Sequence, residues 1–355
     1  MIKLQQLLKS CVQEEASDLH LVEGSSPALR VNGKLVRIKT PSLNGQDIKN
    51  LAYSILTDYQ KSIFEKNKEL DFAFSIKKVS RFRANYFFQK GAISCAFRRI
   101  PLSIPFFSEL ALPNVIASVI NFPQGLVLVC GPTGSGKTTT IASLLNEINK
   151  TRKGHIITVE DPIEYIYKHE KCIVNQREVG LDTKNFEIAA KQLLRQDPDV
   201  CLIGELRDRS SVEFALRLAE TGHLVFATLH TNSAPEAIQR LINMFHGDER
   251  DHVKNMLSQS LNAIISQRLV PGLKGGLVAA CEFLQVNTAI KNMIREDKAH
   301  QIYGAMQMGR DKSGMMTMNN SLMSLILKRK VDIKDAFMFS PDPEELDKAL
   351  QKAGI

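Results

Sequence analysis

The sequence predicts an α/β protein in which a small α+β domain precedes a larger domain with a mostly parallel sheet. Three observations support this prediction. From Gln124 onward, apolar runs of strand length alternate with amphipathic stretches of helix length, as in a parallel sheet with helical crossovers. A glycine-rich octapeptide separates the first of these runs from the first of these stretches. Before residue 100, short alternating segments bounded by turn residues are typical of short strands.

The first domain is expected over residues 1–100 and opens with a short amphipathic helix. Apolar and polar residues then alternate over Ala16–Ile38, where Asn32-Gly33 is a strong hairpin signal. A helical face follows, formed by Ile48, Leu51, Ala52, Ile55 and Leu56. Three strands end the domain, at 70–76, 81–89 and 93–100. The proline-rich segment 101–115 is expected to be an extended linker.

The second domain is expected over residues 116–355. Its predicted strands are 125–130, 155–160, 200–204 and 223–230, and its predicted helices are 138–150, 186–195, 210–221 and 234–245. Two helix starts carry a capping-box pattern, Ser210 with Glu213 and Ser233 with Glu236, and Pro235 suits a first turn. Beyond residue 285 the chain is expected to be mainly helical.

The composition narrows the classes of partner and compartment. A formal net charge of +8 permits nucleic acid or an anionic membrane as partner. The basic residues are dispersed among acidic ones, however, so we expect no nucleic-acid partner. No apolar run approaches the ~20 residues of a membrane helix, and no secretion signal is present. Six scattered cysteines without a C-x-x-C pair argue against structural zinc and favour the reducing cytoplasm.

The glycine-rich octapeptide GPTGSGKT matches the phosphate-binding loop pattern G-x-x-x-x-G-K-[ST], after a strand and before a helix. Its glycines let backbone N–H groups face a phosphate, and the helix N-terminus adds positive potential. Lys137 can bridge the β- and γ-phosphates of ATP, and Thr138 can offer its hydroxyl to Mg²⁺. The alternative is a glycine-rich turn that binds nothing. The expected nucleotide-binding residues are Gly131, Pro132, Thr133, Gly134, Ser135, Gly136, Lys137, Thr138 and Thr139.

Two acidic segments follow predicted strands. Glu205 comes directly after the strand 200–204, at the sheet edge where ligands bind in open α/β folds, and it can act as general base. The alternative for Glu205 is a solvated carboxylate paired with Arg207. The segment TVEDPIEY brings Glu160, Asp161 and Glu164 together, either as a solvated loop or as outer ligands of magnesium.

Two histidines bracket the strand 223–230. His230 ends the strand beside Thr231 and Asn232, so we expect it near the γ-phosphate, where it can distinguish ATP from ADP. His223 stands seven residues earlier, at the far end, and is expected at an edge or subunit contact. The alternative for either residue is a satisfied histidine that caps a core strand.

Four segments together carry a resemblance to a known family: the GPTGSGKT loop, TVEDPIEY, DPDVCLIGELRD and TGHLVFATLHTNSA. They look like the Walker A, Asp, Walker B and His boxes of the secretion-ATPase superfamily. Within it, the chain resembles the retraction ATPases of type IV pili, because AIKNMIRE (289–296) is similar to their AIRNLIRE motif, with Lys291 and Met293 as departures. The tetracysteine motif usual in assembly and secretion relatives is absent from the sequence.

The resemblance implies a homohexamer in which each subunit joins a PAS-like domain to a RecA-like P-loop ATPase domain. It places Lys137, Thr138, Glu164, Glu205 and His230 on nucleotide-site positions, with Glu164 and Thr138 toward Mg²⁺ and Glu205 as base. Arginines of the first domain are expected near the phosphates; Arg81, Arg83 and Arg98 are favoured, with Arg99 also in that stretch.

The expected function is ATP-driven pilus retraction and twitching motility. The expected partner is the inner-membrane pilus platform protein, with the ATPase peripheral at the cytoplasmic face. Three alternatives remain: an accessory retraction paralogue, a DNA-translocating hexameric motor, and a scaffold that binds nucleotide without hydrolysis.

Overall fold

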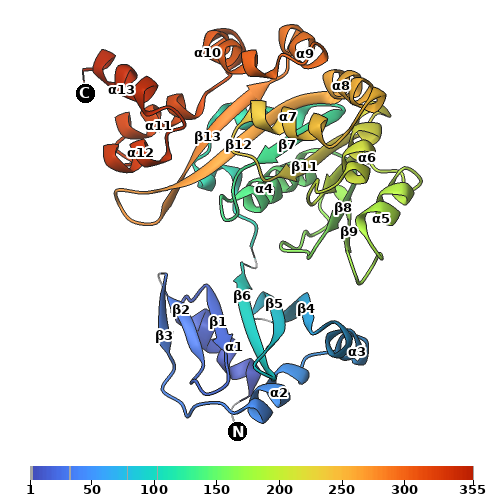
Figure 1. Cartoon of the computed structure of the whole chain (residues 1–355), viewed down its shortest axis with the longest axis vertical. Helices are drawn as coiled ribbons and strands as arrows, with labels where there is room; N and C mark the ends of the chain where they lie inside the picture. The colour runs from blue at the N-terminus through green and yellow to red at the C-terminus, as the bar shows by residue number, and fades with distance from the viewer. Residues whose placement is uncertain (1–2, 32, 78, 102, 355) are drawn as a thin grey trace. The chain divides into compact units, whose positions relative to one another are not determined.

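The computed structural model describes residues 3–31, 33–77, 79–101 and 103–354. It divides the chain into two compact units (Figure 1). Unit 1 comprises Met1–Ser103 together with the short segment Pro162–Ile166. Unit 2 comprises Ile104–Asp161 and Tyr167–Ile355. Most of the segment 101–115, expected as a linker, therefore groups with unit 2, and its short 3₁₀ helix Phe107–Leu110 contacts the first helix of that unit.

Unit 1 is built on an antiparallel six-stranded sheet with the strand order β3-β2-β1-β6-β5-β4. The strands are β1 (Asp18–Leu21), β2 (Ala28–Val31), β3 (Lys34–Arg37), β4 (Glu69–Ile76), β5 (Ser80–Gln89) and β6 (Ala92–Ile100). The hairpin predicted at Asn32-Gly33 joins β2 to β3, with Val31 paired to Lys34. Asn32 itself lies outside the described residues, and Gly33 has a positive φ of 79° that suits this turn.

Three helices accompany this sheet: α1 (Leu4–Gln13), α2 (Gly45–Tyr53) and α3 (Asp58–Asn67). The predicted helical face is present in part: Ile48, Leu51 and Ala52 of α2 are buried in the core of unit 1, whereas Ile55 and Leu56 lie beyond the end of this helix. α3 was not predicted. Thr57 starts it as a capping box with Gln60, and Lys68 ends it in a left-handed conformation.

Unit 2 contains a seven-stranded sheet with the order β13-β12-β7-β11-β10-β8-β9. All its pairings are parallel except that of the edge strand β13 with β12, which confirms the prediction of a mostly parallel sheet. The strands are β7 (Gly125–Cys130), β8 (Gly154–Glu160), β9 (Cys172–Glu178), β10 (Val200–Ile203), β11 (Leu224–Leu229), β12 (Leu261–Pro271) and β13 (Leu277–Gln285). β7, β10 and β11 are buried throughout, as expected for central parallel strands.

Helices connect these strands and follow them at the C-terminal end (Figure 1). They are α4 (Lys137–Thr151), α5 (Phe186–Leu193), α6 (Arg209–Glu220), α7 (Ala234–Asn243), α8 (Asp248–Ser260), α9 (Thr288–Arg295), α10 (Ile302–Ser313), α11 (Met318–Leu327), α12 (Ile333–Phe339) and α13 (Pro343–Lys352). Two further 3₁₀ helices span Asn114–Asn121 and Ala299–Gln301.

The start of α6 differs from the predicted capping box of Ser210 with Glu213. The cap is Asp208, whose side chain accepts a hydrogen bond from the Ser211 backbone N–H at 2.8 Å. Because Asp208 already satisfies this donor, the helix starts one residue earlier, and Glu213 instead pairs with Arg217 one turn along. The predicted cap of α7 is confirmed: Ser233 accepts from the Glu236 N–H, with Pro235 in the first turn.

The motif AIKNMIRE forms α9. Ile290 and Ile294 are fully buried in the core of unit 2, and Met293 is half-buried. The prediction that Ala289 shares this face is wrong, because Ala289 is exposed. At 3.6 residues per turn, Ala289 lies about 140° around the helix from Ile294, which turns its side chain toward solvent.

Candidate nucleotide site

The phosphate-binding loop connects β7 to α4, as predicted. Gly131, Gly134 and Gly136 all have positive φ angles, of 145°, 79° and 87°. A Cβ atom at Gly131 would lie 2.3 Å from the carbonyl oxygen of Gln267, and one at Gly136 would lie 2.7 Å from Gln267 Nε2. Both positions therefore require glycine, for backbone angle and for space. Gln267 is itself held by α4, since its Oε1 accepts from Thr140 Oγ1 at 2.7 Å.

The side chain of Lys137 turns back onto the loop. Its Nζ donates to the carbonyl oxygens of Gly131 at 2.8 Å and Pro132 at 3.0 Å. These bonds keep a buried ammonium satisfied and hold the loop in an arc. Ser135 Oγ, also in this loop, is buried and has no hydrogen-bond partner among the described residues. A phosphate oxygen would satisfy such groups, so the loop fits a nucleotide.

A cavity of about 400 Å³ opens beside the loop. Its size falls in the range of roughly 300–1,000 Å³ usual for small-molecule sites. The lining residues are Pro132, Thr133, Gly134, Ser135, Asn232, Arg268, Leu269 and Phe339. The loop and Asn232 belong to the predicted site, whereas the other side of the cavity was not foreseen.

Arg268, Leu269 and Phe339 are the lining residues that the sequence analysis missed. Arg268 and Leu269 lie on β12, and Arg268 Nη1 donates to the Phe339 carbonyl at the end of α12, at 2.7 Å. Nothing in the local sequence marks them as ligand contacts. Arg268 and Leu269 lie on β12, which pairs with β7, and Phe339 is held to Arg268 by the hydrogen bond at the end of α12, so long-range contacts bring all three to the cavity.

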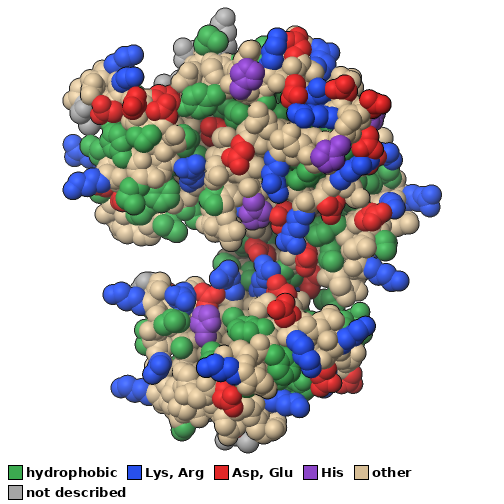
Figure 2. All heavy atoms as spheres, in the orientation of Figure 1, with side chains coloured by type: hydrophobic (Ala, Val, Ile, Leu, Met, Phe, Trp, Pro, Cys, Tyr) green, Lys and Arg blue, Asp and Glu red, His purple; other side chains and the backbone are tan. Residues whose placement is uncertain are grey.

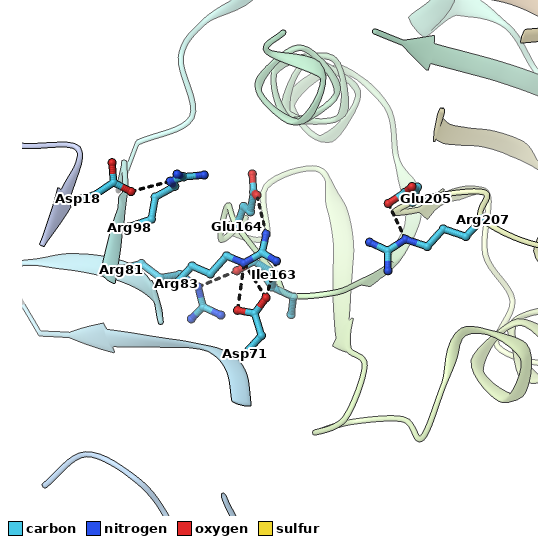
Figure 3. Close-up of polar contacts among 9 residues, drawn as sticks. All are labelled: Asp18, Asp71, Arg81, Arg83, Arg98, Ile163, Glu164, Glu205 and Arg207. Carbon is cyan, nitrogen blue, oxygen red and sulfur yellow. Dashed lines mark hydrogen bonds and ion pairs between the residues drawn. The ribbon is translucent and has the colours of Figure 1, made fainter. Parts of the chain in front are cut away.

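Glu205 and His230 meet at the carboxyl ends of adjacent strands. β10 and β11 pair in parallel, and Glu205 and His230 each follow their strand by one or two residues. Glu205 Oε1 lies 3.3 Å from His230 Nε2, while Glu205 Oε2 accepts from Arg207 Nε at 2.7 Å (Figure 3). The pairing with Arg207, considered above as an alternative, is thus present together with the contact to His230.

His223 lies at the opposite end of β11 from His230. Its Nδ1 lies 3.0 Å from the Leu218 carbonyl oxygen and 3.1 Å from Thr221 Oγ1, so its ring caps the end of α6. Because β11 runs unbroken over Leu224–Leu229, the two imidazoles are separated by the length of the strand. This is the arrangement that the strand geometry predicted.

The predicted arginines and Glu164 lie in unit 1, where each of Arg81, Arg83 and Arg98 has an acceptor and Glu164 lies near Arg83. Arg81 Nε donates to the Ile163 carbonyl at 2.9 Å, and Arg98 Nε donates to Asp18 Oδ1 at 2.9 Å (Figure 3). Arg83 pairs with Asp71 at 2.5 Å, and its Nη1 lies 4.0 Å from Glu164 Oε1. The segment Pro162–Ile166 thus brings Glu164 beside Arg83 within unit 1.

The three carboxylates of TVEDPIEY have different surroundings. Glu160 is buried at the end of β8, where it accepts from Thr158 Oγ1 at 2.7 Å and from Gln176 Nε2 at 3.2 Å. Asp161 is exposed, and Glu164 faces Arg83. Among the described residues, no group of three or more His, Cys, Asp or Glu side chains could hold a metal ion. The three carboxylates therefore do not share one environment, and their expected role as outer ligands of magnesium stays a prediction.

Comparisons with known proteins identify the family of this chain. The family model described as type II/IV secretion system protein matches residues 1–338. The type IV pilus retraction ATPase PilT of Pseudomonas aeruginosa is 44% identical over 339 residues, which cover 96% of this chain and 98% of that protein. The type IV pilus ATPase PilU of the same organism is 37% identical over 346 residues, covering 97% of this chain and 90% of that protein.

A solved structure extends the agreement to the fold. The crystal structure of the pilus retraction motor PilT with bound ADP has a TM-score of 0.91 and 47% identity, covering 98% of this chain and 100% of that one. It confirms the α/β architecture with its small first domain, and its bound ADP supports nucleotide binding by proteins of this kind. With its phosphate-binding loop, its Glu205–His230 pair and its full-length match, the chain belongs to the type II/IV secretion system protein family, among the ATPases of type IV pilus retraction.

Proposed function

We propose that this chain hydrolyses ATP to power the retraction of a type IV pilus, and with it twitching motility. The observation that carries the proposal is the Glu205–His230 contact beside the phosphate-binding loop. β7, which leads into the loop, pairs with β11, and β11 pairs with β10, so the loop, His230 and Glu205 follow three adjacent strands. An open α/β sheet binds its ligand at this edge.

The site residues have distinct roles in the proposed reaction. Lys137 exchanges its two loop carbonyls for phosphate oxygens when nucleotide binds. Glu205 accepts a proton from the attacking water, and His230 orients that carboxylate through their 3.3 Å contact. Arg207 holds the second carboxylate oxygen, which fixes the side chain of Glu205.

Magnesium fits this site as part of the proposal. Thr138 is the second residue of α4, directly after Lys137, and offers a hydroxyl, the kind of oxygen ligand that Mg²⁺ takes beside nucleotide phosphates. A bound Mg²⁺ would neutralise phosphate charge during transfer. Glu164 is proposed as an outer ligand, and Arg81, Arg83 and Arg98 as phosphate contacts. All four side chains already have partners within unit 1. Binding to the phosphates or to magnesium must displace those partners.

The assembly and location belong to the same proposal. We expect a homohexamer that works on the cytoplasmic face of the inner membrane, against the pilus platform protein. Among the described residues, no helix combines the length and apolar character needed to cross a bilayer. The test is deletion of the gene: the expected result is cells with excess pili that neither retract them nor twitch, restored by the wild-type gene.

An accessory role in retraction is the second candidate, since the chain is also 37% identical to the pilus ATPase PilU. If the chain fails to restore twitching to a strain without its primary retraction motor, while improving it in a strain that has one, the accessory role holds. A DNA motor is disfavoured by the surface: on the face shown in Figure 2, basic and acidic side chains are interspersed. An ATPase rate raised by single-stranded DNA would reverse that judgement.

A further inference from the structure

Glu282 is a buried acidic residue that the proposed reaction does not use. It lies in the middle of β13 and is only 1% exposed. In the antiparallel pairing of β12 with β13 it stands opposite Ser266. A carboxylate in such a place is costly unless strong hydrogen bonds hold it.

The hydrogen bonds of Glu282 come from the first residues of two helices. Glu282 Oε1 accepts from the backbone N–H of Ala234, the first residue of α7, at 2.6 Å. The backbone N–H of Met318, the first residue of α11, also bonds to its carboxyl group. Helix N-termini carry unsatisfied donors and positive potential, so one acidic side chain here ties two helices to β13.

One of these helices, α7, begins four residues after His230. Ala234 follows His230 by four residues, and the segment between them, Thr231–Ser233, also carries the pocket-lining Asn232. Ser266 Oγ donates to the Asn232 carbonyl at 3.0 Å, and the Asn232 N–H bonds to Glu236 Oε2 at 2.8 Å. The segment that follows His230 is therefore held from β12 and β13 at successive points.

Charged and titratable groups face Glu282 from the neighbouring elements. Burial raises the pKa of Glu282 to about 7, and Arg268 on β12 works against that rise. Burial is the main cause that raises the pKa values of Tyr303 on α10 and Cys130 on β7. The negative charge of Glu282 adds to both increases. Tyr303 continues the contacts into the C-terminal helices, because its hydroxyl donates to Glu345 of α13.

We propose that Glu282 is a positioning residue that sets the place of His230 against Glu205 by anchoring the start of α7. It acts on the reaction through the segment 231–233, which joins His230 to the anchored start of α7. The inference rests on the proposed ATPase function. The same carboxylate also anchors the start of α11. Glu282 therefore links the position of the C-terminal helices to the position of His230 and Glu205.

The first test compares steady-state ATP hydrolysis by the wild type, Glu282→Gln and Tyr303→Phe. Gln presents one oxygen and an NH₂ group to two N–H donors, so the start of α7 shifts. We expect kcat to fall about 10-fold with KM for ATP unchanged within about twofold, since small misplacements of reacting groups cost this much or more. Tyr303→Phe loosens the C-terminal helices without touching Ala234, so its kcat should match the wild type.

A double-mutant comparison separates positioning from general weakening of the domain. If Glu282 acts through His230, adding Glu282→Gln to His230→Ala should lower the residual single-turnover rate by less than about twofold. A second full 10-fold loss would contradict the proposal, as would an unchanged kcat in Glu282→Gln or an equal loss in Tyr303→Phe.

Two further outcomes have a defined meaning. If Glu282→Gln does not fold, Ser266→Ala takes its place, since it removes the neighbouring bond to Asn232. A several-fold fall in kcat at constant KM is then expected, and an unchanged kcat overturns the inference. A wild-type hexamer without any ATPase activity would contradict the proposed function, whereas an active wild type with indifferent variants contradicts only the role of Glu282.

Discussion

Glu205 Oε1 and His230 Nε2 lie 3.3 Å apart, at the ends of two adjacent parallel strands. Glu205 follows β10 and His230 follows β11, and the parallel pairing of these strands brings the two residues to the same edge of the sheet. Both side chains follow strands of the sheet that also carries the phosphate-binding loop, and there we propose that Glu205 acts as base and that His230 orients it. The first three predictions concern this edge of the sheet.

Replacement of the base should separate binding from chemistry. We expect Glu205→Gln to bind ATP and assemble normally but to hydrolyse it about 100-fold or more slowly, the loss usual for a missing general base. Nucleotide affinity and single-turnover rates measure the two effects. Glu213→Gln, at a half-buried glutamate on the following helix that pairs with Arg217, is the matched control and should keep the wild-type rate. Lost affinity with surviving chemistry would make Glu205 a binding residue.

Loss of the loop lysine should abolish productive turnover. In Lys137→Ala the phosphate charge goes uncompensated, so ATP binding, hydrolysis or both should fail. Lys150→Ala, at the other end of α4, retains the loop and should retain activity. The measurements are nucleotide binding and ATPase rate; turnover at the wild-type rate in Lys137→Ala would refute the assignment of this loop.

Alanine substitutions of the two histidines should have different effects on ATP turnover. His230→Ala should form the ring and lose hydrolysis, because Glu205 loses its orienting partner. His223→Ala removes the contacts of the imidazole with Leu218 and Thr221, far from the nucleotide edge. We expect it to lower the cooperativity of ATP turnover first. ATPase rate against ATP concentration, together with the mass of the assembly, distinguishes them; identical defects would show that this division of roles is wrong.

Glu164 should affect magnesium use without unfolding the protein. We expect Glu164→Gln to weaken the Mg²⁺ dependence of turnover or turnover itself, since a partly exposed loop side chain tolerates substitution. Asp161→Asn, an exposed neighbour in the same segment, serves as control. A magnesium titration and a turnover number that both match the wild type would leave Glu164 only as a partner of Arg83.

A test of whether the α9 motif takes part in retraction requires a substitution at an exposed residue of that helix, because a buried one would destabilise the fold. Ile294 is 0% exposed, so Ile294→Asp buries a charge and should lower the free energy of unfolding by roughly 3 kcal/mol or more. Arg295 is exposed, so Arg295→Ala should keep the fold and the ATPase rate. If the motif serves motor output, this variant should nevertheless lose twitching. Normal twitching by an Arg295→Ala strain would count against that role of the arginine.

Features that depend on residues close together in the sequence could be predicted, whereas features that depend on contacts between distant segments could not. The phosphate-binding loop was predictable because its glycine positions and flanking elements are local, and the Glu205–His230 edge followed from strand order. Arg268 and Phe339 were not predictable, because the pairing of β12 with β7 and the hydrogen bond between Arg268 and the end of α12 are long-range contacts. The burial of Ala289 was wrongly predicted, because the apolar pattern of a short helix does not show which residues at the border of its apolar face contact the core.

The segment Pro162–Ile166 has a consequence for any attempt to divide this protein. The polypeptide passes between the units after Ser103, after Asp161 and after Ile166. A protease cut within 101–115 severs the first connection and leaves the other two intact. A fragment ending at Ser103 would also leave behind the Ile163 carbonyl that accepts the Arg81 hydrogen bond. Limited proteolysis should therefore yield two fragments that remain associated, and the first of them, produced alone, should be less stable than in the whole chain.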